Sequence, residues 1–465
     1  MQLALKRHRL ASLAALLVLV TTALVFSVSA LTPPVPTVWH VDVHATGSGN
    51  TGLDWTNAFN TATALDDAIL AASPGDSLWV ADGSYVPSNP TDGFLITKQL
   101  LIYGGFDGGE GSVATRAGLF RNTILDGTTT MRVITVSGVT PVPVVIDGFQ
   151  VTRGHASGGI GGANGGGMFS EGSGVDLANM YFFDNEAGGA NGGGLYFTGA
   201  PGFEQRLNIK TSEFRSNHVE SKGGALFGAF LKTGDIVNVL FNENYTLLSD
   251  GGAVYLEDMA PTSTLWFTNC IYYRNTANTG AGGSGHGGGL CLGTGSSSPG
   301  NAQVVNCTMV LNSAPSIGNG HALYLGTGAN CEVHNSILYF NPTAAGGFYP
   351  LGGAAPAAMS YCDIQGTLAA GTITNLNPVF RSLASPDTLH LLGPGQATPA
   401  SPCIDNADRT KLPFDNLDVN DDGFTTTQIM PVCYTGSVRN VDWLPSANLG
   451  VPANTYVDMG AFEKQ

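Results

Sequence analysis

The stretch that decides the fold is Phe214-Arg215-Ser216-Asn217, followed six residues later by Gly223-Gly224-Ala225-Leu226. Both phrases recur through the middle of the chain: an aromatic or apolar residue three positions before an asparagine, and then a glycine pair before an apolar residue. The asparagines of successive copies lie 27 to 37 residues apart, and they are Asn185, Asn217, Asn244, Asn275, Asn312 and Asn341. A period near 30 residues is typical of one structural unit stacked many times.

Short apolar segments separated by turn residues fill the chain between these phrases, as in Leu78–Ala81, Leu100–Tyr103 and Val144–Ile146. Strands this short, with no helices between them, do not suit an alternation of strands and helices, and the repeat favours a parallel β-helix over a sandwich or a barrel. Stacked asparagines can hydrogen-bond to the coils above and below them, and a glycine pair supplies positive φ angles at a bend. We therefore predict a parallel β-helix of roughly ten coils, spaced by about 4.8 Å, with the six asparagines as a structural ladder.

Changes in composition divide the chain into four regions. Residues 1–30 have the composition of a signal peptide. Residues 31–76 hold a strand and, at 63–72, apolar residues with helical spacing; we expect a short helix that covers the first coil, because an open coil end exposes unpaired strand backbone. Residues 77–362 carry the repeats. Residues 363–465 are richer in Pro and Asp, and we expect them to form an irregular C-terminal cap at the far end.

The N-terminal region has the three parts of a secretion signal. Lys6, Arg7 and Arg9 precede an apolar run, and Val28-Ser29-Ala30 is a small-residue cleavage site. An uncleaved anchor is the alternative, since the run is at the short limit of a membrane span. The signal holds three of the 19 basic residues and none of the 35 acids, so the mature chain would have a net charge of −19. Such a charge disfavours nucleic acid and anionic membranes as partners.

Several phrases resemble those of known families. The repeats resemble those of chlamydial polymorphic outer membrane proteins. Other phrases resemble secreted bacterial right-handed parallel β-helix proteins of the pectin-lyase-like fold, at residues 81–85, 102–106, 146–149, 401–405 and 457–463. The resemblance implies a right-handed coil and a bacterial protein that is secreted or placed on the cell surface. The chlamydial proteins carry a C-terminal membrane barrel, and we expect this chain to depart from them there, because the helix and its caps would use all 465 residues. No second apolar stretch is long enough to cross a bilayer, so we expect no membrane span after cleavage of the signal.

An acidic loop in the C-terminal region indicates a calcium site. The run Asp418-Val419-Asn420-Asp421-Asp422-Gly423 matches the first half of an EF-hand-type loop. The side-chain oxygens of Asp418, Asn420 and Asp422 would bind Ca²⁺, and the glycine would make the bend. The twelfth position is Ile429 instead of a bidentate glutamate, so an acidic turn without an ion is the alternative. We expect any calcium bound here to be structural.

The seven cysteines leave more than one arrangement open. Cys270 and Cys307 each lie five residues before a ladder asparagine, at an inward position, and we expect buried thiols although their spacing would allow a bridge. Cys403 and Cys433 lie in the C-terminal region, where a disulfide would suit an exported protein.

Candidate catalytic residues are few. A pectate-type lyase needs a base that removes a proton next to a carboxylate and acids that hold a cation. Residues of these types on consecutive coils are the bases Arg215, Lys222 and Arg274 and the acids Glu213, Glu243 and Asp250. His286 lies in a Gly-His-Gly phrase that resembles polygalacturonase-type hydrolases, but the required carboxylate pair is missing and the nearest acids we identified in the sequence are Asp258 and Glu332. Solvated turn charges are the alternative for all of them, and no Lys or Arg occurs between Asn275 and Phe380.

These observations favour a non-enzymatic function. We expect a secreted or cell-surface protein whose long polar faces bind extracellular polysaccharide or cell-surface glycans, in adhesion or in extracellular structure. The alternative is a polysaccharide lyase or glycoside hydrolase acting in the groove of the β-helix, which rests on analogy of fold alone. A cluster of acids with a base on one face of adjacent coils would distinguish the two. The ligand and the oligomeric state stay open.

Overall fold

The structure is a computed structural model of the chain. It describes residues 35–462 apart from 117–119, 140–141, 201–202, 204, 260–261, 281–284, 294–300, 316–318, 343–346, 367–372, 394–395, 398, 420–428, 431 and 435–456. The chain divides into two compact units, Met1–Thr37 and Val38–Gln465, and every described helix and strand belongs to the second unit. The predicted signal peptide lies outside the described residues. None of the helices among the described residues has the length and apolar character that a bilayer crossing needs.

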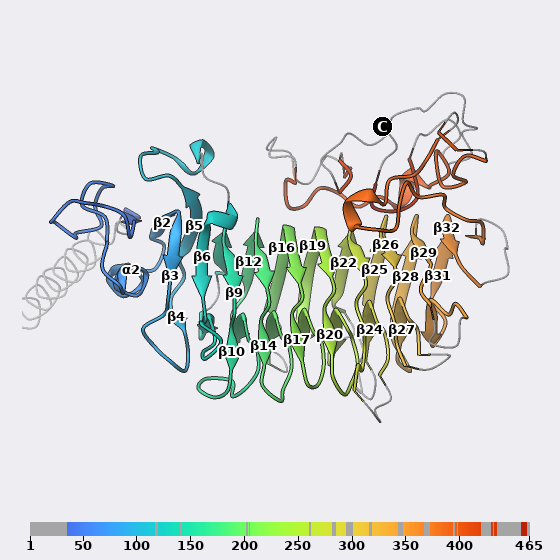
Figure 1. Cartoon of the computed structure of the whole chain (residues 1–465), viewed down its shortest axis with the longest axis horizontal. Coiled ribbons are helices and arrows are strands. Elements are labelled where there is room, and N and C mark those ends of the chain that lie inside the picture. Colours follow the sequence, from blue (N-terminus) through green and yellow to red (C-terminus); the bar gives the residue numbers. More distant parts are fainter. Residues whose placement is uncertain are drawn as a thin grey trace, which may run out of the picture. The chain divides into compact units, whose positions relative to one another are not determined.

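The second unit is a right-handed parallel β-helix, as predicted, built from three stacks of short strands (Figure 1). Stack 1 contains β1 (Val38–Val41), β2 (Ser77–Ala81), β5 (Leu101–Phe106), β8 (Val144–Asp147), β12 (Val175–Ala178), β22 (Thr264–Thr268), β25 (Asn301–Val305), β28 (Asn330–His334) and β31 (Ala358–Ser360). Stack 2 contains β3 (Gly83–Tyr85), β6 (Thr123–Asp126), β9 (Gln150–Thr152), β13 (Tyr181–Phe183), β23 (Ile271–Tyr273), β26 (Thr308–Val310), β29 (Ile337–Tyr339), β32 (Cys362–Ile364) and β33 (Ile373–Thr374). The long strands β16 (Gln205–Arg215) and β19 (Leu231–Asn242) belong to both stacks.

Stack 3 forms the opposite wall of the coil. It contains β4 (Phe94–Ile96), β7 (Ile134–Ser137), β11 (Met168–Glu171), β15 (Leu195–Thr198), β18 (Leu226–Ala229), β21 (Val254–Glu257), β24 (Leu290–Leu292), β27 (Leu323–Leu325) and β30 (Leu351–Gly353). A ladder of two-residue strands joins the stacks at one corner: β10 (His155–Ala156), β14 (Glu186–Ala187), β17 (His218–Val219) and β20 (Tyr245–Thr246). Each strand pairs in parallel with the strand one coil away, so equivalent residues of the repeat lie directly above one another.

Each of the middle coils contributes one aromatic side chain to the same line in the core. Phe182, Phe214, Phe241 and Tyr272 are paired in register and buried, with ring centroids 4.6, 5.4 and 4.8 Å apart. Stacked aromatic rings add to the burial of apolar area that stabilises each coil. The first coil is covered by α2 (Ala64–Ala71), which packs Leu65, Ala68 and Ile69 into the same core.

The ladder asparagines lie buried in one line beside this core. The Nδ2 of Asn217 donates to the Oδ1 of Asn244 at 3.0 Å and to the carbonyl of Phe182 at 2.9 Å. The same pattern extends from Asn185 to Asn341, with side-chain bonds of 2.8 to 3.2 Å between successive members. Each Oδ1 also accepts the backbone N–H of the preceding member. Buried amides are therefore satisfied without water, as their burial requires.

The two glycines of each pair have different roles. Gly192 has a φ of +69°, a conformation that favours glycine. Gly193 lies against the next coil, where an added Cβ would stand 2.3 Å from the carbonyl oxygen of His218. The first glycine makes the bend and the second allows two backbones to approach closely.

The irregular C-terminal region differs in position from the prediction. The described residues of 376–462, here called the strap, run back along the outer face of stacks 1 and 2 instead of covering the far coil (Figure 1). The reason is the apolar outer face of the later coils, where Ile271, Val310 and Ile337 would otherwise meet water. Leu389, Met459 and Phe462 of the strap cover that face.

Candidate functional site

Charged side chains occupy the outer face of stack 2 in the middle coils. Along β16 the alternation of a strand points Phe214 into the core and Glu213 and Arg215 outward. Glu243 follows β19 and Arg274 follows β23, each at the corner before a ladder asparagine, with φ values of 56° and 54°. Successive coils therefore place these four residues side by side.

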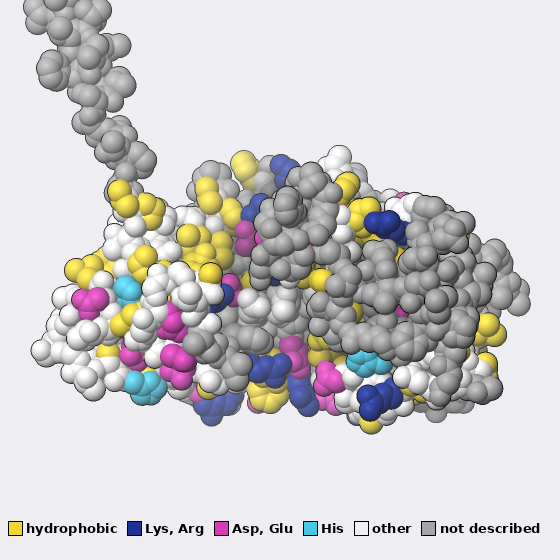
Figure 2. All heavy atoms as spheres, turned by 90° about the horizontal axis from the view of Figure 1, so that it is seen from above, with side chains coloured by type: hydrophobic (Ala, Val, Ile, Leu, Met, Phe, Trp, Pro, Cys, Tyr) yellow, Lys and Arg dark blue, Asp and Glu magenta, His cyan; other side chains and the backbone are white. Residues whose placement is uncertain are grey.

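A pocket of about 310 Å³ opens where these residues meet the strap. We call it the paired-charge pocket, and its charged lining residues are Arg121, Arg215, Arg274, Glu213, Glu243 and Asp387. Arg121 pairs with Glu213, and Glu243 lies between Arg215 at 3.7 Å and Arg274 at 3.8 Å. Three arginines face three acids, so the formal charges cancel. Figure 2 shows basic and acidic side chains close to one another on the coloured part of the molecule seen from above.

The acid at the bottom of the pocket is in a different environment from the arginines. The Glu213 side chain is 14% exposed, whereas Arg121, Arg215 and Arg274 are 44 to 47% exposed. Burial raises the pKa of the Glu213 carboxyl, although Arg121 and Arg215 act in the opposite direction. The guanidinium of Arg121 also lies over the ring of Tyr181, at 4.0 Å from its centroid. A carboxyl with a raised pKa in a polar pocket is the type of group that functional sites contain.

The pocket offers donors and acceptors in alternation. Guanidinium groups only donate hydrogen bonds and carboxylates only accept them, whereas a sugar hydroxyl does both. Tyr273, Tyr434 and Asn242 add aromatic and amide surface. Chemically, this arrangement suits a polyhydroxylated ligand without a strong net charge.

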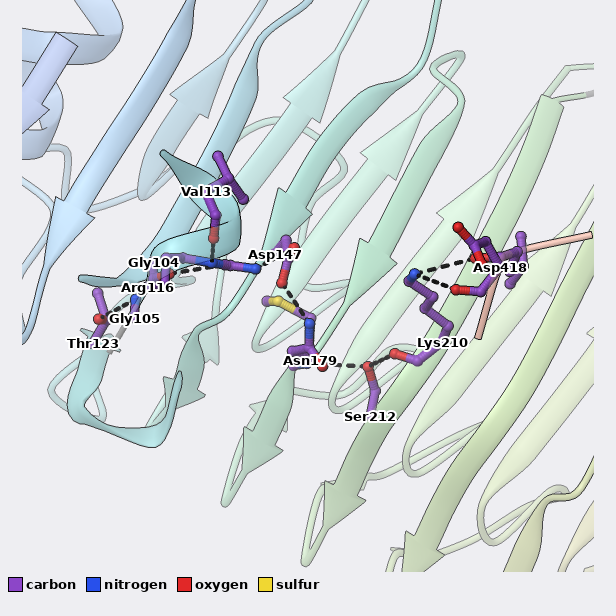
Figure 3. Close-up of polar contacts among 12 residues, drawn as sticks. Gly104, Gly105, Val113, Arg116, Thr123, Asp147, Asn179, Lys210, Ser212 and Asp418 are labelled. Carbon is purple, nitrogen blue, oxygen red and sulfur yellow. Dashed lines mark hydrogen bonds and ion pairs between the residues drawn. The ribbon is translucent and has the colours of Figure 1, made fainter. Parts of the chain in front are cut away.

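A second depression, here called the side groove, continues the same face over the earlier coils of stack 1. It encloses about 410 Å³ and is lined by Tyr103, Asp147, Asp176, Arg206, Asn208 and Lys210, with Asn416 and Leu417 of the strap. Figure 3 shows Arg116 and Asn179 converging on Asp147, at 3.0 and 2.8 Å. Lys210 extends to the strap and donates to the carbonyls of Leu417 and Asp418, both at 3.1 Å.

Two predicted site residues lie on another wall. Lys222 pairs with Glu257 at 2.7 Å and covers the ring of Tyr255 on the outside of stack 3. His286 bonds to Asp250 at 2.8 Å. The grouping of Lys222 and Asp250 with Arg215 and Arg274 is therefore wrong. The reason is that Lys222 leads into β18 of stack 3, whereas Arg215 ends β16 on the outer face of stack 2.

The predicted calcium loop is described only in part. Asp418 lies on the strap, and Asn420 and Asp422 fall outside the described residues, so the calcium site stays a prediction. No group of three or more acid, histidine or cysteine side chains placed for a metal occurs among the described residues.

The proposed Cys403–Cys433 bridge is not formed. Both side chains are buried thiols, and that of Cys403 donates to Asp363 Oδ2 at 3.3 Å. Cys270 and Cys307 are buried thiols as expected, and burial raises the pKa of Cys270 well above its usual value.

The sequence-based prediction missed a second line of asparagines. Asn269, Asn306 and Asn335 lie six residues before ladder members, at the corner between stacks 1 and 2, with φ values of 51 to 55°. Their side chains bond to the strap: to the carbonyls of Val432, Asp458 and Asp408. The signal was present as the spacing Asn-x5-Asn, which begins with Asn179 and lapses at Thr211.

Comparison with known proteins gives likenesses among solved structures only. No protein-family model matches the chain, and no curated protein matches it. A solved structure titled "Crystal structure of pectate lyase Pel9A" is similar, at 14% identity and a TM-score of 0.44, over 94% of this chain and 98% of that one. The strand pairing of the three stacks defines this chain as an all-parallel β-helix, in agreement with the pectin-lyase-like fold implied by its phrases.

Proposed function

We propose that this protein is exported from a bacterial cell, is secreted or held at the cell surface, and binds a neutral glycan on the outer face of stacks 1 and 2 without cleaving the glycan chain. The observation that carries the proposal is the paired-charge pocket, where three arginines and three acids cancel in charge at a partly open site. The pocket lies on the outer face of stack 2 and the side groove on that of stack 1, and both are bounded by the strap. Their volumes fall in the range of small-molecule sites.

Charge supports a neutral ligand over an acidic one. The chain has a formal net charge of −16, and the arginines of the pocket are already paired with acids. An acidic polysaccharide would meet repulsion from the whole molecule and no unpaired cluster of arginines in this pocket. A neutral sugar gains hydrogen bonds from both members of each pair.

A second candidate is a polysaccharide lyase or glycoside hydrolase acting at the same pocket. It is favoured by the cluster of acids and bases that Glu213, Glu243 and Arg215 form on one face of adjacent coils, the arrangement expected of an enzyme. Burial raises the pKa of Glu213, which would suit a general acid. Adhesion and extracellular structure are further uses of a glycan-binding face, and calcium in the 418–423 loop would be structural.

The test is retention of the full chain on immobilised neutral and acidic polysaccharides with calcium present, together with assays for chain cleavage. We expect retention on a neutral glycan, no cleavage, and a weakening of roughly tenfold in Arg274→Gln, which loses a charged hydrogen bond to the ligand. Lys232→Gln is the matched control. Lys232 is exposed on β19, and its substitution removes one positive charge outside the pocket. Cleavage that Glu213→Gln abolishes would favour the enzyme, and retention on none of the polymers would refute glycan binding.

A further inference from the structure

The last coils of stack 1 carry a polar group that neither the paired-charge pocket nor the side groove uses. Glu332 and His334 lie on β28, and Ser360 lies on the neighbouring strand β31. The two strands are parallel, with His334 directly opposite Ser360 and Val333 opposite Met359. Val333 belongs to the core, so alternation along the strands places Glu332, His334 and Ser360 on the outer face.

The three side chains form one hydrogen-bonded chain. The Oγ of Ser360 lies 2.7 Å from Nδ1 of His334, and Nε2 of His334 lies 3.2 Å from Oε2 of Glu332. The Glu332 carboxylate can only accept, so it fixes the proton on Nε2. Nδ1 then carries a lone pair and accepts a hydrogen bond from the hydroxyl of Ser360.

The surroundings keep the imidazole neutral and the carboxylate charged. Burial lowers the pKa of His334, and the charge of Lys411 acts in the same direction, while Glu332 and Asp408 oppose it. The hydrogen bond from His334 holds the pKa of Glu332 below its usual value. At neutral pH the serine hydroxyl therefore faces an unprotonated base.

A cavity lies against this chain. It encloses about 360 Å³ between stack 1 and the strap, and Glu332, His334, Trp266, Gln303 and Lys411 line it. Ser360 is half-buried on the neighbouring strand, and its hydroxyl lies within hydrogen-bond distance of His334, which lines the cavity. Trp266 supplies an aromatic surface, and Lys411 supplies a positive charge near the base.

We propose that Ser360, His334 and Glu332 form a hydrolytic site for esters, with Ser360 as nucleophile, His334 as general base and Glu332 as a positioning residue. Ser360 Oγ forms a bond to the ester carbonyl carbon while its proton passes to His334 Nδ1. The C–O bond to the alcohol breaks, and the alcohol leaves with that proton. Water then attacks the acyl-serine in the same way, releasing a carboxylic acid and restoring Ser360.

The cavity indicates the substrate class. Its volume suits a small acyl group joined to one ring-shaped alcohol, and Lys411 would stabilise the oxyanion of the tetrahedral intermediate. We assign an O-acyl ester of a sugar hydroxyl. The sugar part of this assignment rests on the proposed function, whereas the ester chemistry does not.

The first experiment separates the two claims. The full chain is treated with a fluorophosphonate, which phosphonylates an activated serine with loss of fluoride, and is assayed for hydrolysis of 4-nitrophenyl acetate and acetylated xylan. We expect the label on Ser360 and a loss of hydrolysis of roughly 10³-fold or more in Ser360→Ala. Ser382→Ala is the matched control, since Ser382 is also half-buried and its hydroxyl accepts the backbone N–H of Ala384 instead of facing a histidine.

An unlabelled wild-type chain without hydrolysis, or hydrolysis that persists in Ser360→Ala, would overturn the inference. Retention of a glycan by a chain that hydrolyses neither ester would overturn it and leave the proposed function standing. Hydrolysis of 4-nitrophenyl acetate alone, dependent on Ser360, would support the ester chemistry and refute the sugar ester.

A second experiment distinguishes positioning by Glu332 from a structural role. Activity should fall as pH decreases through the pKa of His334, because only the neutral imidazole accepts the serine proton. Glu332 raises that pKa, so Glu332→Gln should shift this acid limb to lower pH and reduce kcat. An unchanged acid limb would refute the assigned role.

Discussion

Two lines of asparagine run along the same coils, six residues apart, and they do different work. The ladder from Asn185 to Asn341 is buried, and its side chains bond to side chains and backbone of their own and adjacent coils. The outer line, with Asn269, Asn306 and Asn335, holds the strap. The ladder has an asparagine in every one of these coils, whereas the outer line is interrupted by Thr211.

The difference shows that one residue type can join successive coils in one place and bind the strap in another. A buried amide between two identical neighbours is satisfied by its own repeat. An amide at the outer corner still has an N–H that can bond to another segment, and in this protein it donates to carbonyls of the strap. The comparison can be tested by removing one member at a time.

The largest effect is expected from the middle of the ladder. Asn244→Ala leaves the side-chain and backbone N–H groups of Asn217 without their shared acceptor, and the Phe214 carbonyl without its donor. We expect a loss of roughly 3 to 5 kcal/mol in the free energy of unfolding, measured in urea. The control Asn330→Ala, at an exposed pair, should change it by under about 0.5 kcal/mol. Equal losses in the two variants would contradict the distinction.

The next effect concerns the place where the last coil meets the strap. Burial raises the pKa of Asp363, which accepts the thiol proton of Cys403, to about 6. Its folded pKa exceeds its unfolded value, so the native state binds more protons and stability falls as pH rises. The wild type should lose about 3 kcal/mol between pH ~4 and ~6 and little above it.

Asp363→Asn should remove that slope, because the amide does not titrate. Urea unfolding at intervals from pH 4 to 7 measures both curves. Parallel curves would show that another group is responsible.

A smaller effect is expected in the outer line. Asn335→Gly keeps the left-handed backbone but loses the bonds to Asp408. We expect a loss of about 1 to 2 kcal/mol and faster protease cleavage of the strap, with the far-ultraviolet circular dichroism of the β-helix unchanged. Cleavage as slow as in the wild type would mean that apolar contacts alone hold the strap.

The smallest effect is expected at the open corner. Arg274→Gln breaks a half-exposed ion pair with Glu243, at 3.8 Å, and should change stability by under about 0.5 kcal/mol. The same variant should weaken glycan retention. A large loss of stability would instead make the paired-charge pocket a structural feature.

Prediction from the sequence succeeded where the repeat itself carries the information. The ~30-residue spacing indicated stacked coils, and the helix near residues 63–72 was read from its apolar spacing. Prediction failed for the side chains that do not repeat from coil to coil and for contacts with the strap. The acid that meets His286 is Asp250, one coil earlier and 36 residues away, whereas Asp258 and Glu332 are the first acids before and after it in the sequence. No Lys or Arg occurs in the sequence from Asn275 to Phe380, but Lys411 of the strap lies beside this part of the β-helix and lines the same cavity as Glu332 and His334.

The sequence by itself therefore determined the coil, because each coil repeats the same local choices: a core aromatic, a ladder asparagine and a glycine bend. The tertiary structure alone decided which charges meet. Arg121 comes to Glu213 across 92 residues, and Asn306 bonds to the Asp458 carbonyl across 152. The second contact depends on where the strap covers the apolar outer face, and no periodic signal in the chain encodes that position.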